Sequence, residues 1–342
     1  MPRLTVNDTM SHKPLDVLTI GNAIVDILAH AEDTFILEQN IIKGAMQLID
    51  EERAESLYKV MGPATIMSGG SAANTAVGIA GMGAKAGFIG KVRNDELGSL
   101  FIHDLEAVHV AYNVQPAVEG AATARCFVLI TPDGERTMNT YLGACQGLDV
   151  TDIDPDFVAS SKIIYLEGYL WDPPKAKDAF RKAIMIAHNT GSQVALTLSD
   201  SFCVDRYRSE FLSLIRDGSI DVLFANMGEL KSLYETSDEA TAIAALRDEG
   251  ILGVVTRSEL GAFLVSREET KSVPAFPVSR VVDTTGAGDL FAAGFLTGLT
   301  KGLKAEDCAS LGALAASEII SHIGPRPQDN LLRLAQQQGF EL

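Results

Sequence analysis

The clearest indication of the fold is the stretch Asp283-Thr284-Thr285-Gly286-Ala287-Gly288-Asp289, which leads into an apolar run over residues 290–296. The β-rich residues 278–282 before it predict a strand, the glycines a tight turn and the apolar run a helix. Free backbone N–H groups and the positive end of that helix would then converge on one point and bind an anion. The alternative is an ordinary glycine turn in which Asp289 only stabilises the helix dipole.

Short β-rich runs alternate with helical patterns along most of the chain, which predicts βαβ units and a mainly parallel sheet. Ligands of such sheets bind beyond the carboxyl ends of the strands. We expect strands at residues 16–21, 86–92, 162–166, 193–198, 221–225 and 253–256, and helices at residues 71–82, 97–108, 174–188 and 240–248.

Two regions interrupt this alternation. Residues 123–131 and 135–141 flank the turn Pro132-Asp133-Gly134, which is typical of a β-hairpin. The other region, residues 28–66, fits no simple βαβ unit. We therefore expect one domain spanning residues 1–342, with a small β lid formed by insertions at about 28–66 and 119–142.

The composition narrows the class of partner. The chain has 342 residues, 46% of them hydrophobic, and a formal net charge of −17, so its averaged field repels phosphate backbones and anionic membranes. We expect small-molecule substrates, no nucleic acid and no membrane. ATP would be repelled too, so a nucleotide site here has to be made positive locally.

The cysteines and the N-terminal residues predict a cytoplasmic protein. The four cysteines lie far apart without a C-x-x-C pair, which favours reduced, buried thiols. Residues 1–15 contain no continuous apolar core, so no signal peptide is expected. The assembly is expected to be a monomer or a homodimer.

A second glycine-rich segment is Ser68-Gly69-Gly70-Ser71-Ala72-Ala73-Asn74. Its small residues permit close backbone approach, and Asn74 is placed to hydrogen-bond a ligand hydroxyl. Tight helix-on-sheet packing is the alternative explanation. Neither G-x-x-x-x-G-K-[ST] nor a G-x-G-x-x-G after the first strand occurs, which disfavours P-loop enzymes and dinucleotide dehydrogenases.

These motifs together resemble the ribokinase-like (PfkB) carbohydrate and nucleoside kinases. Residues 283–289 match that family's D-T-x-G-A-G-D signature, and Gly69-Gly70 with Asn74 resembles its first signature. The element Asn226-Met227-Gly228-Glu229 resembles its N-x-x-E motif. The resemblance implies a three-layer α/β/α fold with a β lid, ATP as phosphate donor, Mg²⁺, and possibly K⁺ beside the anion-binding loop.

The resemblance also implies roles for individual residues. Asp289 would be the catalytic base, the N–H groups of Gly286, Ala287 and Gly288 would hold the γ-phosphoryl group, and Arg136 would swing over the phosphates when the lid closes. The alternative for Arg136 is an ordinary exposed arginine of the hairpin. Residues expected to bind the acceptor are Asn22, Asp26, Gly69, Gly70, Asn74 and Tyr169. Residues expected to bind ATP or Mg²⁺ are Asn226, Glu229 (through water), Thr256, Gly261, Asp283 and Thr285. The alternative for Glu229 is a solvated carboxylate at the start of a helix.

Within the family, several stretches resemble adenosine kinases, notably residues 21–27, 198–202 and 221–226. The sequence departs from that pattern at Gly168-Tyr169-Leu170-Trp171, where adenosine kinases tend to carry a pair of phenylalanines. Tyr169, Trp171 and Phe202 are the aromatic residues expected to offer a stacking face to a purine. We expect transfer to the 5′-hydroxyl of adenosine. The alternatives are a ribose or fructose kinase and a catalytically silent nucleoside- or sugar-binding regulator.

Overall fold

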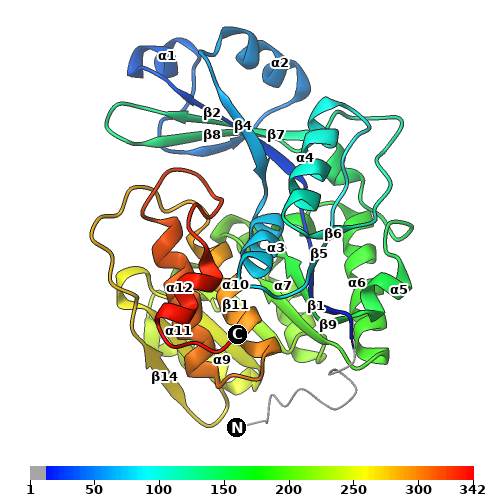
Figure 1. Ribbon diagram of the computed structural model, residues 1–342, viewed down its shortest axis with the longest axis vertical. Helices are drawn as coiled ribbons and strands as arrows, with labels where there is room; N and C mark the ends of the chain where they lie inside the picture. The colour runs from blue at the N-terminus through cyan, green and yellow to red at the C-terminus, as the bar shows by residue number, and fades with distance from the viewer. Residues whose placement is uncertain (1–12) are drawn as a thin grey trace.

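The computed structural model describes residues 13–342, and a nine-stranded sheet forms the centre of its larger part (Figure 1). Neighbouring strands from β6 through β12 are parallel, whereas β13 and β14 extend the sheet in antiparallel fashion. The mainly parallel sheet expected from the sequence is confirmed. In spatial order the strands are β14 (Thr270–Val273), β13 (Ala262–Val265), β12 (Leu252–Thr256), β11 (Val222–Asn226), β10 (Gln193–Thr197), β9 (Ser161–Glu167), β1 (Leu15–Ile20), β5 (Ala86–Ile89) and β6 (Ala111–Tyr112).

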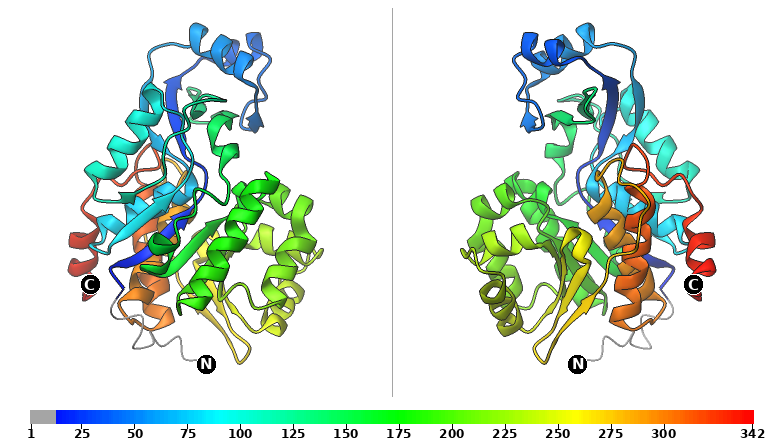
Figure 2. Two further views of the ribbon diagram at one scale, coloured as in Figure 1. Left: turned by 90° about the vertical axis from the view of Figure 1, so that its right-hand side faces the viewer. Right: turned by 90° about the vertical axis from the view of Figure 1, so that its left-hand side faces the viewer.

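Helices cover both faces of this sheet (Figure 2), and each face buries its own apolar cluster. This makes three layers, α/β/α, as the resemblance implies. One layer comprises α3 (Ser71–Gly81), α4 (Glu96–Ala107), α10 (Ala287–Thr300), α11 (Ala305–Ile319) and α12 (Leu331–Gln337). The other comprises α5 (Pro155–Ala159), α6 (Pro174–Asn189), α7 (Ser201–Arg216), α8 (Met227–Leu233) and α9 (Glu239–Glu249). Single 3₁₀ turns are η1 (Gly143–Gly147), η2 (Gly168–Trp171) and η3 (Ser258–Leu260).

A separate five-stranded sheet stands at one end of the large sheet (Figure 1). Its antiparallel pair β7–β8 is the hairpin expected around Pro132-Asp133-Gly134. The strands in spatial order are β3 (Met46–Leu48), β8 (Arg136–Tyr141), β7 (Ala124–Ile130), β2 (Ile24–His30) and β4 (Thr65–Gly69). We refer to this sheet, with helices α1 (Asp33–Glu38) and α2 (Glu51–Val60), as the lid.

The two faces of the lid sheet differ because side chains alternate along each strand. Ile27 and Phe127 point to one face, where they are buried with Ile36 of α1 and Leu57 of α2. Leu28, Cys126, Val128 and Ile130 form a smaller apolar cluster on the opposite face, with Asp26 in register beside Cys126. This second face is the one that carries a carboxylate toward the larger sheet.

One expected strand is wrong. Residues 278–282 have no regular secondary structure, although valines dominate the segment. Val281 is 53% and Val282 41% exposed, and the backbone N–H groups of Val282 and Asp283 donate to the carbonyl of Ile320. The segment is therefore held against the end of α11 and does not pair with the edge strand β14.

Two other expectations concern the thiols and membrane spans. All four cysteines are free and buried, as expected. Among residues 13–342, no helix combines the length and apolar character needed to cross a bilayer. The N-terminal segment on which the expectation of no signal peptide rested lies almost wholly outside the described residues.

Candidate active site

The site lies at the carboxyl edge of the large sheet, under the lid (Figure 1). Several parallel strands end there on polar residues: Asn22 follows β1, Glu167 ends β9 and Asn226 ends β11. Thr256 ends β12 directly beside Asn226 in the parallel register. The carboxyl ends of the strands therefore bring together side chains from distant parts of the chain.

Asp289 joins the two glycine-rich segments. It lies in the first turn of α10, and its Oδ1 accepts a hydrogen bond from the hydroxyl of Ser71 at 2.6 Å. Oδ2 accepts one from the amide of Asn74 at 2.9 Å, 215 residues away in sequence. Burial raises the pKa of Asp289, while the bonds from Ser71 and Asn74 act to lower it. Asn74 was expected to meet a ligand hydroxyl; here its amide holds Asp289, and its buried Oδ1 has no partner.

Both helices that meet at Asp289 begin at glycines in the left-handed or related positive-φ region. Gly286 precedes α10 with φ +79°, and Gly70 precedes α3 with φ +89°. Neither glycine can supply a side-chain cap, and the first turn of a helix leaves its N–H groups without helical partners. In α3 the N–H of Ala72 is bound instead by the carboxylate of Glu167. The N–H of Ala287 already donates to the carbonyl of Thr284 at 3.2 Å, which closes the turn. The uncapped start of α10 thus presents a positive end beside Asp289.

The glycine pair Gly69-Gly70 is required by close contacts. A Cβ at Gly69 would lie 2.3 Å from Oδ2 of Asp26, and one at Gly70 would lie 2.4 Å from the carbonyl oxygen of Asn22. Larger residues at either position would displace the Asp26 carboxylate or the Asn22 backbone. Gly69 is therefore packed against Asp26 and Gly70 against Asn22, and the assignment of these four residues to acceptor binding stays a prediction.

Asp283 links the lid to the anion-binding loop. Its Oδ1 accepts from the N–H of Thr285, its Oδ2 accepts from the N–H of Gly324, both at 3.0 Å, and Oδ2 also pairs with the guanidinium of Arg136 on β8. The Arg136 side chain is 13% exposed, so it is not a free hairpin arginine. Its buried Nε has no hydrogen-bond partner.

Glu167 is a buried residue of the site that the sequence motifs did not reveal. Its Oε1 accepts from the side-chain amide of Asn22 at 2.7 Å, and its Oε2 accepts from the N–H of Ala72 at 2.8 Å. Burial raises the pKa of Glu167 to about 7, and burial also raises the pKa of Asp26 to about 7. A charged residue at the end of an otherwise apolar strand was the available signal.

Asn226 and Glu229 form a capping box at the start of α8. The side chain of Asn226 accepts from the N–H of Glu229 at 2.8 Å, and Glu229 accepts from the backbone and side-chain N–H groups of Asn226. Glu229 is 5% exposed, so the alternative of a solvated helix-start carboxylate is wrong. Burial raises its pKa to about 7, and the charge of Asp200 adds to that rise.

Gly261 is required for packing, whether or not it binds ATP. It has φ +83°, and a Cβ there would lie 2.0 Å from the carbonyl oxygen of Val273. This packing joins the start of β13 to the end of β14, and no recorded contact within the described residues links Gly261 to Asp289. Its assignment to ATP binding stays a prediction.

The aromatic residues after β9 do not all face the site. Trp171 is fully buried between Phe180 and Phe211, so the expectation that it offers a stacking face to a purine is wrong. Trp171 is buried because its large apolar ring fills the core between the sheet and helices α6 and α7. Tyr169 remains 37% exposed as a residue. Burial of its hydroxyl raises its pKa, and the negative charges of Asp200, Glu229 and Asp289 raise that pKa further. Phe202 is 76% exposed.

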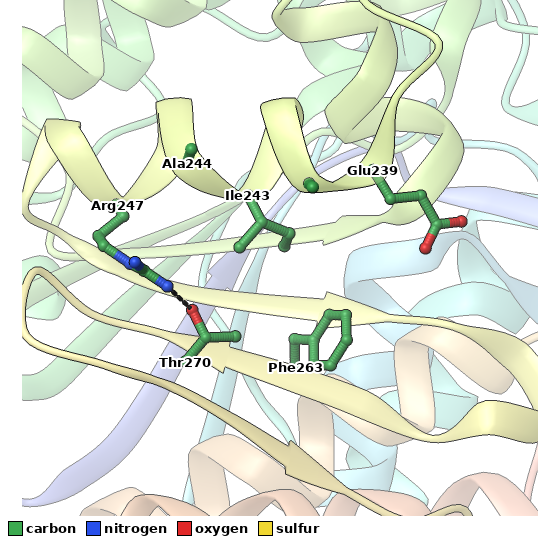
Figure 3. A pocket seen from close by; sticks show the side chains of 7 residues that line it. Glu239, Ile243, Ala244, Arg247, Phe263 and Thr270 are labelled. Atoms are coloured by element: carbon green, nitrogen blue, oxygen red, sulfur yellow. Dashed lines mark hydrogen bonds between the residues drawn. The ribbon is translucent and has the colours of Figure 1, made fainter.

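A hollow elsewhere on the surface is separate from this constellation. It lies between α9 and β13, with Ile243, Ala244 and Phe263 as an apolar floor and the Arg247–Thr270 hydrogen bond at one end (Figure 3). None of its lining residues belongs to the contacts around Asp289.

Comparison with known proteins identifies the family. The model of the pfkB family carbohydrate kinases matches residues 46–330. The chain belongs to the PfkB family. Its fold is the ribokinase-like fold that the sequence resemblance implied, and the chain is a carbohydrate or nucleoside kinase of that family.

Relatives within the PfkB family differ in their acceptors. A solved adenosine kinase from Sinorhizobium meliloti is 54% identical, covering 95% of this chain and 99% of its own, with a TM-score of 0.90. A solved probable sugar kinase from Rhizobium etli CFN 42 is 51% identical, covering 96% of this chain and 99% of its own, with a TM-score of 0.91. An adenosine kinase from Saccharomyces cerevisiae is 26% identical over 334 residues, covering 90% of this chain and 96% of its own.

Proposed function

We propose that this PfkB protein transfers the γ-phosphoryl group of MgATP to the 5′-hydroxyl of adenosine. The observation that carries the kinase part is the position of Asp289, held by Ser71 and Asn74 at the uncapped start of α10. A carboxylate fixed beside an anion-binding helix end can take a proton from a hydroxyl that attacks a phosphoryl group bound there.

The residues divide the reaction between them. The carboxylate of Asp289 accepts the 5′-hydroxyl proton as that oxygen forms a bond to the γ-phosphorus, and the bond to the β–γ bridging oxygen breaks to release ADP. The N–H groups at the start of α10 compensate charge on the transferring group. Arg136 brings a guanidinium from the lid, and its unpartnered Nε is free to donate to a phosphate oxygen. Asn22 and Asp26 bind the acceptor's sugar hydroxyls.

The described residues fit a magnesium ion that is held mainly by the nucleotide. They contain no group of three or more His, Cys, Asp or Glu side chains arranged to hold a metal. Mg²⁺ commonly binds one or two carboxylates, several waters and substrate phosphates, so Glu229 would contact it through water. When bound, the ion supplies positive charge to the phosphate oxygens. K⁺ at Asp283 fits less well, because that carboxylate is already neutralised by Arg136.

The lid supports a nucleoside as the acceptor. Beside Asp26, the lid face turned to the site carries the apolar cluster of Leu28, Cys126, Val128 and Ile130. A nucleobase has a flat aromatic face that such a surface can bind, whereas a free sugar has no aromatic ring. The 54% identity to an adenosine kinase also supports adenosine. The 51% identity to a probable sugar kinase makes a free sugar the second candidate acceptor.

Incubation with MgATP and adenosine, inosine, ribose or fructose, followed by measurement of ADP, tests this proposal. We expect adenosine to give the highest kcat/KM. A higher kcat/KM for ribose or fructose would overturn the choice of acceptor and leave the kinase intact. If none of the four compounds leads to ADP formation, a binding protein without catalytic activity would be favoured.

A further inference from the structure

Arg326 reaches the site from the far end of the chain. It lies in the loop between α11 and α12, yet its Nε donates to the carbonyl of Ser68 and its Nη1 to the carbonyl of Ala73, both at 3.0 Å. Its Nη2 donates to the hydroxyl of Ser68, also at 3.0 Å. One guanidinium thus joins the end of β4 to the first turn of α3, which carries Asn74.

The loop that carries Arg326 is anchored on both sides of it. Oε1 of Glu318 on α11 accepts from the N–H groups of Gln328 and Asp329, both at 2.8 Å. The N–H of Gly324 donates to Asp283 at 3.0 Å. Anchors on α11 and on the anion-binding loop hold the backbone of this loop, so the guanidinium is presented from the larger part of the fold and meets the lid at Ser68 of β4.

The charge of Arg326 is not consumed by an ion pair. All three of its hydrogen-bond acceptors are uncharged oxygens of Ser68 and Ala73. Burial lowers the pKa of Arg326 to about 10, so it stays a cation at neutral pH. Its field acts on three carboxylates, Asp26, Asp104 and Asp289. Without a cation here, two carboxylates would face each other across the acceptor subsite and ATP would add further negative charge.

Asp289 has several titratable neighbours besides Arg326, and all of them are acidic groups. They come from different elements packed against α10, and each either repels a carboxylate or adds no positive charge. The groups whose charges interact with Asp289 are Asp26 of β2, Tyr165 and Glu167 of β9, and Tyr169 of η2. Arg326 is therefore the cation whose field reaches Asp289 from a fixed element.

We propose that Arg326 is a positioning residue of this site: it aligns the end of β4 with the start of α3, whose Asn74 holds Asp289, and its buried charge favours the ionised form of that carboxylate. The inference rests on the proposed phosphotransfer and adds to it a residue outside the family's glycine-rich signatures. It also gives the C-terminal loop a part in catalysis that does not require contact with substrate.

The test compares the pH dependence of kcat/KM for adenosine in the wild-type chain, Arg326→Met, Arg326→Lys and Arg333→Met. In Arg326→Met the acidic limb should move to higher pH by about one unit, because a nearby opposite charge shifts a carboxylate by about that much or more. Arg326→Lys keeps the charge and should keep the limb near its wild-type position. Arg333 is exposed, so Arg333→Met removes the same net charge from the surface and should leave the limb unchanged.

Rescue of kcat by added guanidinium ion is a second measurement, and a purely structural role of Arg326 predicts no such rescue. At millimolar concentrations the ion should partly restore kcat of Arg326→Met at neutral pH and do nothing for Arg333→Met. If Arg326→Met fails to fold, as judged by thermal unfolding, Arg326→Lys still decides: a limb shifted by a full unit in this charge-conserving variant would overturn the proposal. An unshifted limb in a folded Arg326→Met would overturn it too. Absence of ADP formation by the wild-type chain would refute the proposed function itself.

Discussion

Asp26 binds the acceptor in this account, whereas Asp289 takes the acceptor's proton. Substitutions of the two residues are therefore expected to change different kinetic constants. Asp26→Asn should raise KM for adenosine roughly 10- to 100-fold, the range expected when a hydrogen bond to a charged group is lost. KM for ATP should change little, because Asp26 lies on the lid face beside Cys126 and Gly69. Steady-state kinetics with each substrate varied in turn measures both. Equal effects on the two KM values would contradict the assignment.

The raised pKa of Asp26 gives adenosine binding a pH dependence. Burial raises that pKa to about 7, so the carboxylate is largely protonated at pH 6 and largely ionised at pH 8. The ionised form accepts hydrogen bonds from both of its oxygens. We expect calorimetric titration without ATP to show Kd falling between pH 6 and pH 8 in the wild-type chain and a flatter profile in Asp26→Asn. A wild-type Kd that is constant or rises over this range would count against the role of Asp26.

Which single residues could be predicted depended on whether they belong to a motif. Asp289 and the glycine pair at 69–70 have spacings that few structures share, and the structure places Asn74 and Asp289 in contact. Glu167 and Arg326 were missed because each is an isolated charged residue with no recurring neighbours in sequence. Their importance comes from burial and from contacts across 145 and 258 residues, which only the folded chain creates.

At the scale of elements, the hairpin β7–β8 connects the lid to the chemistry through Arg136. A lid has to open for exchange of substrates and close for reaction. Hydrogen exchange in residues 124–141 should therefore slow on addition of adenosine, by more than in strands β9 and β10 of the large sheet. Exchange that does not respond to adenosine would show that the hairpin is a static part of the fold.

Arg136→Ala should lower kcat more than it weakens adenosine binding, because the guanidinium meets phosphate charge that develops in the transition state. We expect a loss of about 10²-fold or more in kcat, the order found for a single charge-stabilising donor. Arg53→Ala is the matched control, since Arg53 is a lid arginine of α2 bonded to Gln39. A kcat for Arg136→Ala equal to that of Arg53→Ala would contradict the role of Arg136.

Elements were predicted well where periodicity and boundary signals agreed. The strands around Ile20 and Thr256, and the hairpin turn at Asp133, combine β-rich runs with glycine or proline at their ends. Residues 278–282 have the same β-rich composition but bond to the carbonyl of Ile320 at the end of α11 instead of to a strand, and composition alone carries no information about a partner. Trp171 illustrates the same limit, because its neighbours Phe180 and Phe211 belong to helices that follow it in sequence.

For the whole molecule, buried carboxylates link stability to pH. Burial raises the pKa of Glu167 and of Glu229 from the ordinary value of 4.5 for a glutamate to about 7. Between pH 4.5 and pH 7 these two glutamates still hold protons in the folded chain but have released them in the unfolded chain. The stabilisation that the two side chains contribute to the folded state is therefore fully present below about pH 4.5 and is lost as pH rises to about 7. The wild-type chain should therefore lose stability relative to Glu167→Gln over this interval.

Denaturant unfolding of both chains at pH 5 and pH 8 measures this difference. One unit of pKa shift corresponds to about 1.4 kcal/mol, so the difference between the two chains is large enough to resolve. A difference between wild type and Glu167→Gln that is the same at both pH values would show that Glu167 titrates normally in the folded chain.

The most direct test of the whole account is the single-turnover transfer of phosphate from MgATP to adenosine by Asp289→Asn, with adenosine binding measured on the same preparation. The account predicts that the rate falls by ~10²–10⁴, as expected when a general base is removed, while Kd for adenosine stays within a few-fold of wild type. A folded Asp289→Asn that transfers phosphate at a near-wild-type rate would contradict the central claim that Asp289 takes the acceptor's proton.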